Sequence, residues 1–136
     1  MSSSGPLTLC IDCGGGGIKG SVADEFATVI ANPVRKRAPY PMPPKVLVET
    51  ISSIAAELPR ADRVTVGMPG MIRHGRVIAT PHYITKDGPR SKVVPELKDA
   101  WRNFDMKAAI EGAFDLPTIV LNDAEVAGAG VITGTG

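Results

Sequence analysis

Aromatic residues, cysteine and excess charge of either sign are all scarce in this chain of 136 residues. Phe, Trp and Tyr make up 4% of it, which argues against a surface that stacks nucleic-acid bases. The formal net charge is +1, so no bulk attraction to nucleic acid or to membranes is expected. No apolar run approaches the roughly 18 residues of a membrane helix, and the first residues lack the charged start and apolar core of a signal peptide. We expect a cytoplasmic protein with no nucleic-acid or membrane partner.

The two cysteines, Cys10 and Cys13, form a single C-x-x-C pair. A zinc site would need a second pair of ligands, and His74 and His82 are remote from the cysteines and from each other. Residues three apart on an extended strand point to opposite faces. We therefore interpret the cysteines as buried thiols.

A glycine-rich stretch over residues 12–20 dominates the rest of the sequence. It follows a short apolar run, residues 7–11, that predicts a buried strand. Glycine lets backbone N–H groups approach a ligand closely, and successive N–H groups form an anion-binding concavity. We expect the ligand to be a phosphate group, with Asp12 facing its metal ion. The alternative is a tight hairpin turn that binds no ligand. The expected phosphate-binding residues are Gly14, Gly15, Gly16, Gly17 and Lys19, although a lysine at a strand edge is usually only solvated.

Two better-known phosphate motifs are excluded by the residues around these glycines. The dinucleotide spacing G-x-G-x-x-G occurs at Gly15, Gly17 and Gly20, but it requires a helix directly afterwards and an acid about 20 residues on. Strand-forming residues 21–23 follow instead, which excludes a Rossmann oxidoreductase. A Walker A loop is excluded because Lys19 does not stand in a G-K-[ST] triplet.

Hydrophobic periodicity predicts the later elements. A third strand is expected over residues 26–32, with residues 34–38 extending the same edge. The further expected elements are a helix from Pro44 to Pro59, a strand over 64–68, a hairpin of 71–73 and 76–79, a short helix over 95–100, a helix capped by Asp105, a strand over 118–121 and a helical segment over 124–131. The expected buried faces of the two longer helices are Leu47, Ile51, Ile54, Ala55 and Leu58, and Met106, Ala109, Ile110, Ala113 and Phe114.

This order predicts one α/β domain whose mixed sheet is flanked by helices, with an antiparallel opening hairpin and parallel later strands. Ligands of such sheets bind beyond the carboxyl ends of the strands. Asp12, the sequence Gly67-Met68-Pro69-Gly70 and the pair Asn122-Asp123 all follow predicted strands. We expect these segments to face one cleft.

Together, these motifs resemble those of the ROK family (repressors, open reading frames, kinases), within the actin-like, hexokinase-like ATPases. The glycine-rich stretch is similar to the family's first phosphate motif, in a form closer to polyphosphate glucokinases than to ordinary ROK glucokinases. Gly67-Met68-Pro69-Gly70 resembles the G-x-P-G element that lines the sugar pocket. Asn122-Asp123-Ala124 resembles the N-D-A motif. The resemblance implies an actin-like, hexokinase-like (ribonuclease H-like) N-terminal lobe.

The resemblance also implies an activity: phosphoryl transfer from ATP or polyphosphate to a hexose, with glucose expected. Asp123 would be the general base, Asn122, Gly70 and His82 would border the sugar, and Asp12 would hold Mg²⁺. Taken alone, Asp123 would be interpreted first as an ordinary helix cap and His82 as a structural histidine. The alternative for Asp12 is a strand-end acid that binds local amides. The alternative function is a non-catalytic sugar-sensing or assembly module, against which Asp123 counts because sensing needs no base.

The resemblance covers only the first lobe of the family's fold. We expect residues 1–136 to be an N-terminal lobe, inactive alone, of a protein that is a homodimer at full length and carries its nucleotide-binding lobe and zinc-binding cysteines further on. Thr80-Pro81-His82 stands where relatives often have Thr-Pro-Asn, and residues 83–100 form a longer stretch than usual, so sugar specificity stays open. Family repressors carry a DNA-binding segment ahead of the first strand, and with so few residues before Leu7 we expect none here.

Overall fold

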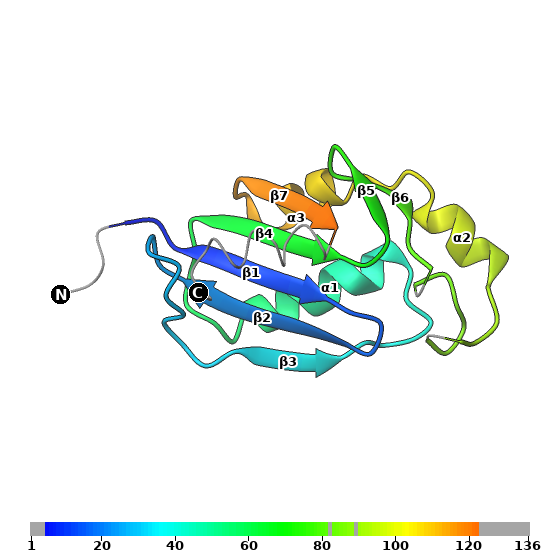
Figure 1. Ribbon diagram of the computed structural model, residues 1–136, viewed down its shortest axis with the longest axis horizontal. Coiled ribbons are helices and arrows are strands. Elements are labelled where there is room, and N and C mark those ends of the chain that lie inside the picture. Colours follow the sequence, from blue (N-terminus) through cyan, green and yellow to red (C-terminus); the bar gives the residue numbers. More distant parts are fainter. Residues whose placement is uncertain (1–4, 82, 89, 123–136) are drawn as a thin grey trace.

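The protein folds into a twisted five-stranded sheet with helices packed on one face, as a computed structural model shows for residues 5–81, 83–88 and 90–122 (Figure 1). The strand order is β3-β2-β1-β4-β7. The strands are β1 (Thr8–Cys13), β2 (Gly17–Ala23), β3 (Val34–Arg37), β4 (Arg63–Met68) and β7 (Thr118–Asn122). β1 pairs antiparallel with β2 and β2 antiparallel with β3, whereas β1–β4 and β4–β7 are parallel. The predicted mixed sheet is confirmed.

Helices α1 (Pro44–Ala55) and α3 (Met106–Phe114) lie behind the sheet in Figure 1, on the same face. Pro44 begins α1 at a position where proline loses no helical hydrogen bond. The side chain of Asp105 caps α3 by accepting a hydrogen bond of 2.9 Å from the N–H of Ala108. Both predicted helices are confirmed, with two differences. α1 ends at Ala55, so Leu58, expected on its buried face, lies beyond the helix. Ala113, expected in the buried face of α3, is exposed.

The core lies between these helices and the sheet. Alternate strand residues point into it, because successive side chains of a strand point to opposite faces. The buried members from the strands and from the two helices are Leu9, Ile11, Cys13, Ile18, Val22, Val64, Val66, Met68, Val120, Leu47, Ile51, Ile54, Met106 and Ile110. We call this side of the sheet the helix-covered face and the other side the opposite face.

The third strand expected over residues 26–32 is wrong. The carboxylate of Asp24 accepts hydrogen bonds from the N–H groups of Phe26 and Thr28, both at 2.9 Å, and Ala27 has a positive φ of 64°. These contacts make a turn, and only an isolated bridge joins Val29 to Ala23. The edge strand is β3, which starts after Pro33. Local hydrogen bonding by Asp24 therefore outweighs the strand propensity of the apolar residues that follow it.

A small two-stranded sheet, β5 (Met71–Arg73) and β6 (Arg76–Ala79), lies beside β7, with helix α2 (Pro95–Trp101) next to it (Figure 1). Its turn residues His74 and Gly75 both have positive φ values, 52° and 78°, as a two-residue hairpin turn requires. Both elements match the sequence-based expectation. No helix within the described ranges is long and apolar enough to cross a membrane.

Candidate functional site

The glycine-rich stretch forms the turn between β1 and β2, as predicted. The N–H of Gly14 donates to the carbonyl of Gly17 at 2.9 Å and closes the turn. The N–H of Ala38, just after β3, donates to the carbonyl of Gly16 at 3.2 Å. Within the described part of the chain, no acceptor takes the N–H groups of Gly15 and Gly16. Two adjacent amides are therefore available to an anion.

Two tyrosines hold the other side of this turn. The hydroxyl of Tyr40 donates to the carbonyl of Gly15 at 2.6 Å, and that of Tyr83 donates to the carbonyl of Gly14 at 2.7 Å. Tyr83 is fully buried, and the centroid of its ring lies 5.7 Å from that of Trp101. The indole N–H of Trp101 donates to the carbonyl of Met42 at 2.8 Å. Burial raises the pKa of Tyr40 above its ordinary value, so its hydroxyl keeps the donated proton. The carbonyls of the turn are fixed toward the protein.

Sequence reasoning missed both tyrosines. They lie 25 and 69 residues from the glycines that they contact. Their contacts are hydrogen bonds to backbone carbonyls, which leave no mark on the sequence of the glycine stretch. An aromatic content as low as 4% made each tyrosine notable, but it did not indicate a partner.

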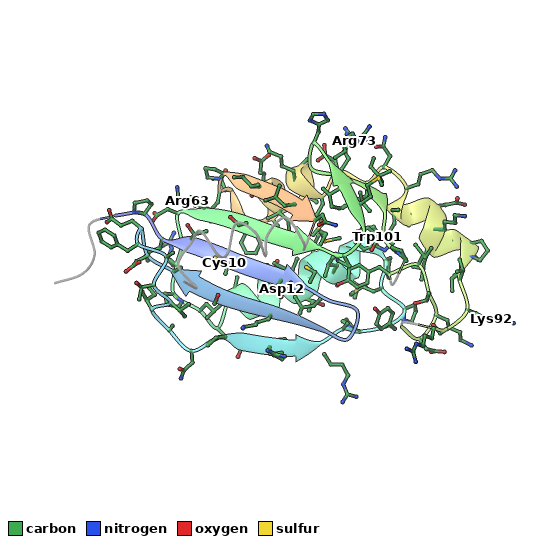
Figure 2. The ribbon with its side chains drawn as sticks, viewed as in Figure 1. Cys10, Asp12, Arg63, Arg73, Lys92 and Trp101 are labelled. Carbon is green, nitrogen blue, oxygen red and sulfur yellow. The ribbon has the colours of Figure 1, made fainter. Side chains whose placement is uncertain are left out.

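Asp12 lies at the carboxyl end of β1, one residue before the turn begins, and its carboxylate is exposed on the opposite face (Figure 2). It stands in register with Lys19 of β2 on one side and with Gly67 of β4 on the other. Neither Asp12 nor Lys19 forms an ion pair within the described residues. The carboxylate of Asp12 is therefore available to a cation beside the turn.

Gly70 and Asn122 meet at the same edge. Asn122 ends β7, and its amide N–H donates to the carbonyl of Gly70 at 2.6 Å. Gly70 has a φ of 95°, and a Cβ there would collide with the carbonyl of Ala79, so only glycine fits between β4 and the β5–β6 hairpin. Because β1, β4 and β7 are parallel neighbours, Asp12, Gly70 and Asn122 share one edge of the sheet, as expected.

Other predicted site residues lie elsewhere or outside the description. His82 and Asp123 are outside the described residues, as is the expected helical segment over 124–131. Cys13 is buried in the core and Cys10 is half-buried on the opposite face. Burial raises the pKa of the Cys10 thiol, an effect that the nearby charge of Arg63 partly offsets.

The sequence of the chain matches a family model over most of its length. The model of the ROK family matches residues 8–133. The chain belongs to the ROK family. Among curated proteins, none matches the chain in sequence.

Solved structures of sugar kinases share this fold. An inorganic polyphosphate/ATP-glucomannokinase from Arthrobacter sp. strain KM is 28% identical, with a TM-score of 0.72 over 92% of this chain and 47% of that chain. A ROK family glucokinase from Streptomyces griseus, in complex with glucose and AMPPNP, is 26% identical, with a TM-score of 0.68 over 90% of this chain and 35% of that chain. The predicted fold class, that of ROK sugar kinases, is confirmed.

Regulators share the fold as well. A ROK family transcriptional regulator, a homologue of the E. coli MLC protein, matches 88% of this chain with a TM-score of 0.63 at 19% identity. The fold alone therefore does not separate kinases from regulators. The chain spans less than half the length of each of these three solved structures.

Proposed function

We propose that this chain is the N-terminal lobe of a cytoplasmic sugar kinase that transfers a phosphoryl group from ATP or polyphosphate to a hexose, with glucose as the expected acceptor. The observation that carries the proposal is the shared edge at which a glycine turn with available amides, the carboxylate of Asp12 and the Gly70–Asn122 contact meet. An anion-binding turn and a polar wall for hydroxyl groups are the two halves that phosphoryl transfer to a sugar needs.

On the donor side, the amides of Gly15 and Gly16 would bind phosphate oxygens, while Gly14 and Gly17 shape the turn. Lys19 would add a positive charge beside them. The single exposed carboxylate of Asp12 fits Mg²⁺, which keeps several waters and binds through one or two carboxylates together with substrate phosphates. Bound there, the ion would neutralise charge on the phosphates.

On the acceptor side, Gly70, Asn122 and His82 would border the sugar. The carboxylate of Asp123 would accept the proton of the attacking hydroxyl as the new O–P bond forms. The bond from the transferred phosphorus to the bridging oxygen breaks, and its electron pair stays on the shortened donor. A weak base suffices, because the transition state is loose and depends mainly on positioning and charge neutralisation.

A non-catalytic sugar-sensing module is the second candidate, and the shared fold of the ROK regulator favours it. A coupled assay of the full-length protein with several hexoses, and with ATP and polyphosphate as donors, distinguishes the two. Turnover with one pair supports the kinase. Sugar binding without turnover, for every combination of hexose and donor, would instead support the sensing module.

The variant Asp123→Asn tests the mechanism in the same protein. Removal of the base with its shape retained should lower kcat by at least about 100-fold, while calorimetry shows sugar binding largely unchanged. Unchanged activity would make Asp123 an ordinary cap.

The division into lobes has its own test. The 136-residue chain should fold, yet show no turnover, because the donor must be held from both sides in line with the hydroxyl. Substantial turnover by the isolated chain as a monomer would contradict this, and sedimentation of the isolated chain shows whether two copies instead complete one site. For the full-length protein we propose a homodimer, which sedimentation of that protein tests.

A further inference from the structure

Three cations gather on the opposite face of the sheet, beside the glycine turn. Lys19 of β2 stands directly across from Arg35 of β3, and Arg37 stands across from Gly17, the last glycine of the turn. All three side chains are exposed. Residues directly opposite in an antiparallel pair point to the same face, so this cluster, which we call the basic track, begins where the turn ends.

The alternation of side chains along β3 supports this placement. Lys36, between the two arginines, points to the helix-covered face, where its ammonium group forms an ion pair of 2.7 Å with Glu57 just after α1. Arg35 and Arg37 must then point to the opposite face. Neither they nor Lys19 form an ion pair with any described residue.

The cluster carries an electrostatic cost that the strand register offsets only at Lys19, which stands across from Asp12 of β1. Like charges directly across a strand pair are destabilising, and Asp12 is the one acid among the described strand residues of this face. Charged residues on an edge strand protect it against pairing with other chains, which accounts for cations on β3. Edge protection does not extend to Lys19, which lies on the inner strand β2 with Asp12 across from it on one side and Arg35 on the other.

We propose that the basic track binds the phosphates of a long inorganic polyphosphate donor that lie beyond the phosphate held at the turn. The inference rests on the proposed function and specifies its donor. The order of the strands supports it: the Gly70–Asn122 wall lies just after β4 and at the end of β7, Asp12 on β1, and the cations on β2 and β3. A donor whose terminal phosphate faces the sugar wall past Asp12 extends over the turn toward β3.

Spacing favours a chain of phosphates over a single one. Neighbouring strands lie about 4.8 Å apart, and residues two apart on a strand about 7 Å, so the three cations are spread over the face, with Lys19 beside Arg35 and with Arg37 two residues along β3, beside the turn. Each flexible side chain would contact a different phosphate group. A nucleotide carries only three phosphates followed by an uncharged nucleoside, and it would gain less from Arg35 and Arg37 than a long polyphosphate does.

The test uses the full-length protein and the double variant Arg35→Gln/Arg37→Gln. Binding of long-chain polyphosphate, of tripolyphosphate and of ATP is measured directly by calorimetry, and KM by the coupled assay. We expect Kd and KM for long-chain polyphosphate to rise about fivefold to tenfold, since each exposed charge contact contributes a few-fold in affinity. The values for ATP and tripolyphosphate should change by less than about twofold. Arg35→Lys/Arg37→Lys keeps the charges and should restore most of the affinity.

Two matched controls remove the same charge elsewhere. Arg63→Gln changes the opposite face at the amino end of β4, far from the turn (Figure 2), and Lys36→Gln changes β3 on the helix-covered face. Both should leave polyphosphate affinity unchanged. An equal loss in Arg63→Gln, an equal loss for ATP, or single-stranded RNA that competes with polyphosphate at physiological salt would overturn the proposal in favour of a general polyanion surface.

The outcomes separate this inference from the proposed function. Polyphosphate binding that depends on Arg35 and Arg37, without phosphorylation of any sugar, would remove the kinase and keep the track as a polyphosphate-binding site. Sugar phosphorylation with ATP, and polyphosphate binding that does not respond to the double variant, would keep the kinase and overturn the track.

Discussion

The two faces of the five-stranded sheet are made from the same strands but differ in what they contain. Ile18 and Lys19 are neighbours on β2, and the first is fully buried under α1 while the second is exposed beside the glycine turn. On β3, Lys36 is ion-paired toward the helices, whereas Arg35 and Arg37 point the other way. The helix-covered face holds the fold together, and the opposite face carries the unpaired charges that a phosphate donor would use.

This difference follows from the alternation of side chains along a strand, which places neighbouring residues on opposite faces of the sheet. Every second residue is fixed by packing, so it cannot vary freely without a loss of stability. The residues between them contribute little to packing and are free to serve binding. Substitutions at adjacent positions should therefore affect different properties of the protein, which makes the division testable.

The largest effect is expected from a substitution that creates a cavity in the core between the sheet and the helices. Ile18→Ala should lower the free energy of unfolding by about 2–5 kcal/mol, because a fully buried side chain is truncated in a packed core. Lys19→Ala at the next position should change it by less than about 0.5 kcal/mol. Urea unfolding measures both, and similar losses at the two positions would contradict the division between the faces.

The next effect concerns Gly70, at the carboxyl edge of the sheet between β4 and β5. Gly70→Ala should cost about 1–3 kcal/mol, because φ is 95° and the new methyl group meets the carbonyl of Ala79. Gly112→Ala, inside α3 with no heavy atom within 4 Å of the added Cβ, should instead stabilise by about 0.5–1 kcal/mol. Thermal unfolding of the two variants compares a strained glycine with an unstrained one, and equal shifts would refute the role of Gly70.

Sequence periodicity predicted the helix-covered face well. The apolar residues of α1 and α3 recur at helical spacing, and buried strand residues alternate, so these elements and the mixed sheet followed directly. The third strand was misplaced because Asp24 forms local hydrogen bonds that periodicity does not describe. Among the site residues, Asp12 and Asn122 could be found because each lies at the carboxyl end of a strand and belongs to a family motif.

The opposite face and the support of the turn were beyond such reasoning. Arg35 and Lys19 become neighbours only through the register of β2 and β3, which the misplaced strand obscured. Tyr83 reaches Gly14 across 69 residues of chain. Both relations depend on tertiary placement, so composition and spacing carry no sign of them.

A smaller effect is expected from the loss of the buried hydrogen bond between Tyr83 and the glycine turn. Tyr83→Phe removes the hydroxyl that binds the carbonyl of Gly14, at a cost of about 0.5–1.5 kcal/mol. If this bond positions the turn, KM for the phosphoryl donor should rise while KM for the sugar stays constant. Phe104→Leu, in the same aromatic cluster but at the far side of Trp101 from Tyr83 in the chain of ring contacts, should lower stability without a change in donor KM. A donor KM that responds equally to both variants would make Tyr83 a packing residue only.

The smallest effect concerns the pH dependence of the second tyrosine. Tyr40 is half-buried, and burial raises its pKa above the ordinary value of about 10. The folded protein then holds this proton more tightly than the unfolded chain does, so the contribution of Tyr40 to stability is complete below pH 10 and is lost as the pH rises through the raised pKa. Ionisation also removes the hydroxyl hydrogen that binds the carbonyl of Gly15.

Tyr40→Phe should accordingly be less stable than the wild type at pH 8, and the difference should shrink above pH 10. Urea unfolding of both proteins from pH 8 to pH 11 measures it. Every other titrating group is common to the two chains, so the change in the difference reports on Tyr40 alone; a difference that stays constant over this range would show that the hydroxyl of Tyr40 does not hold the turn.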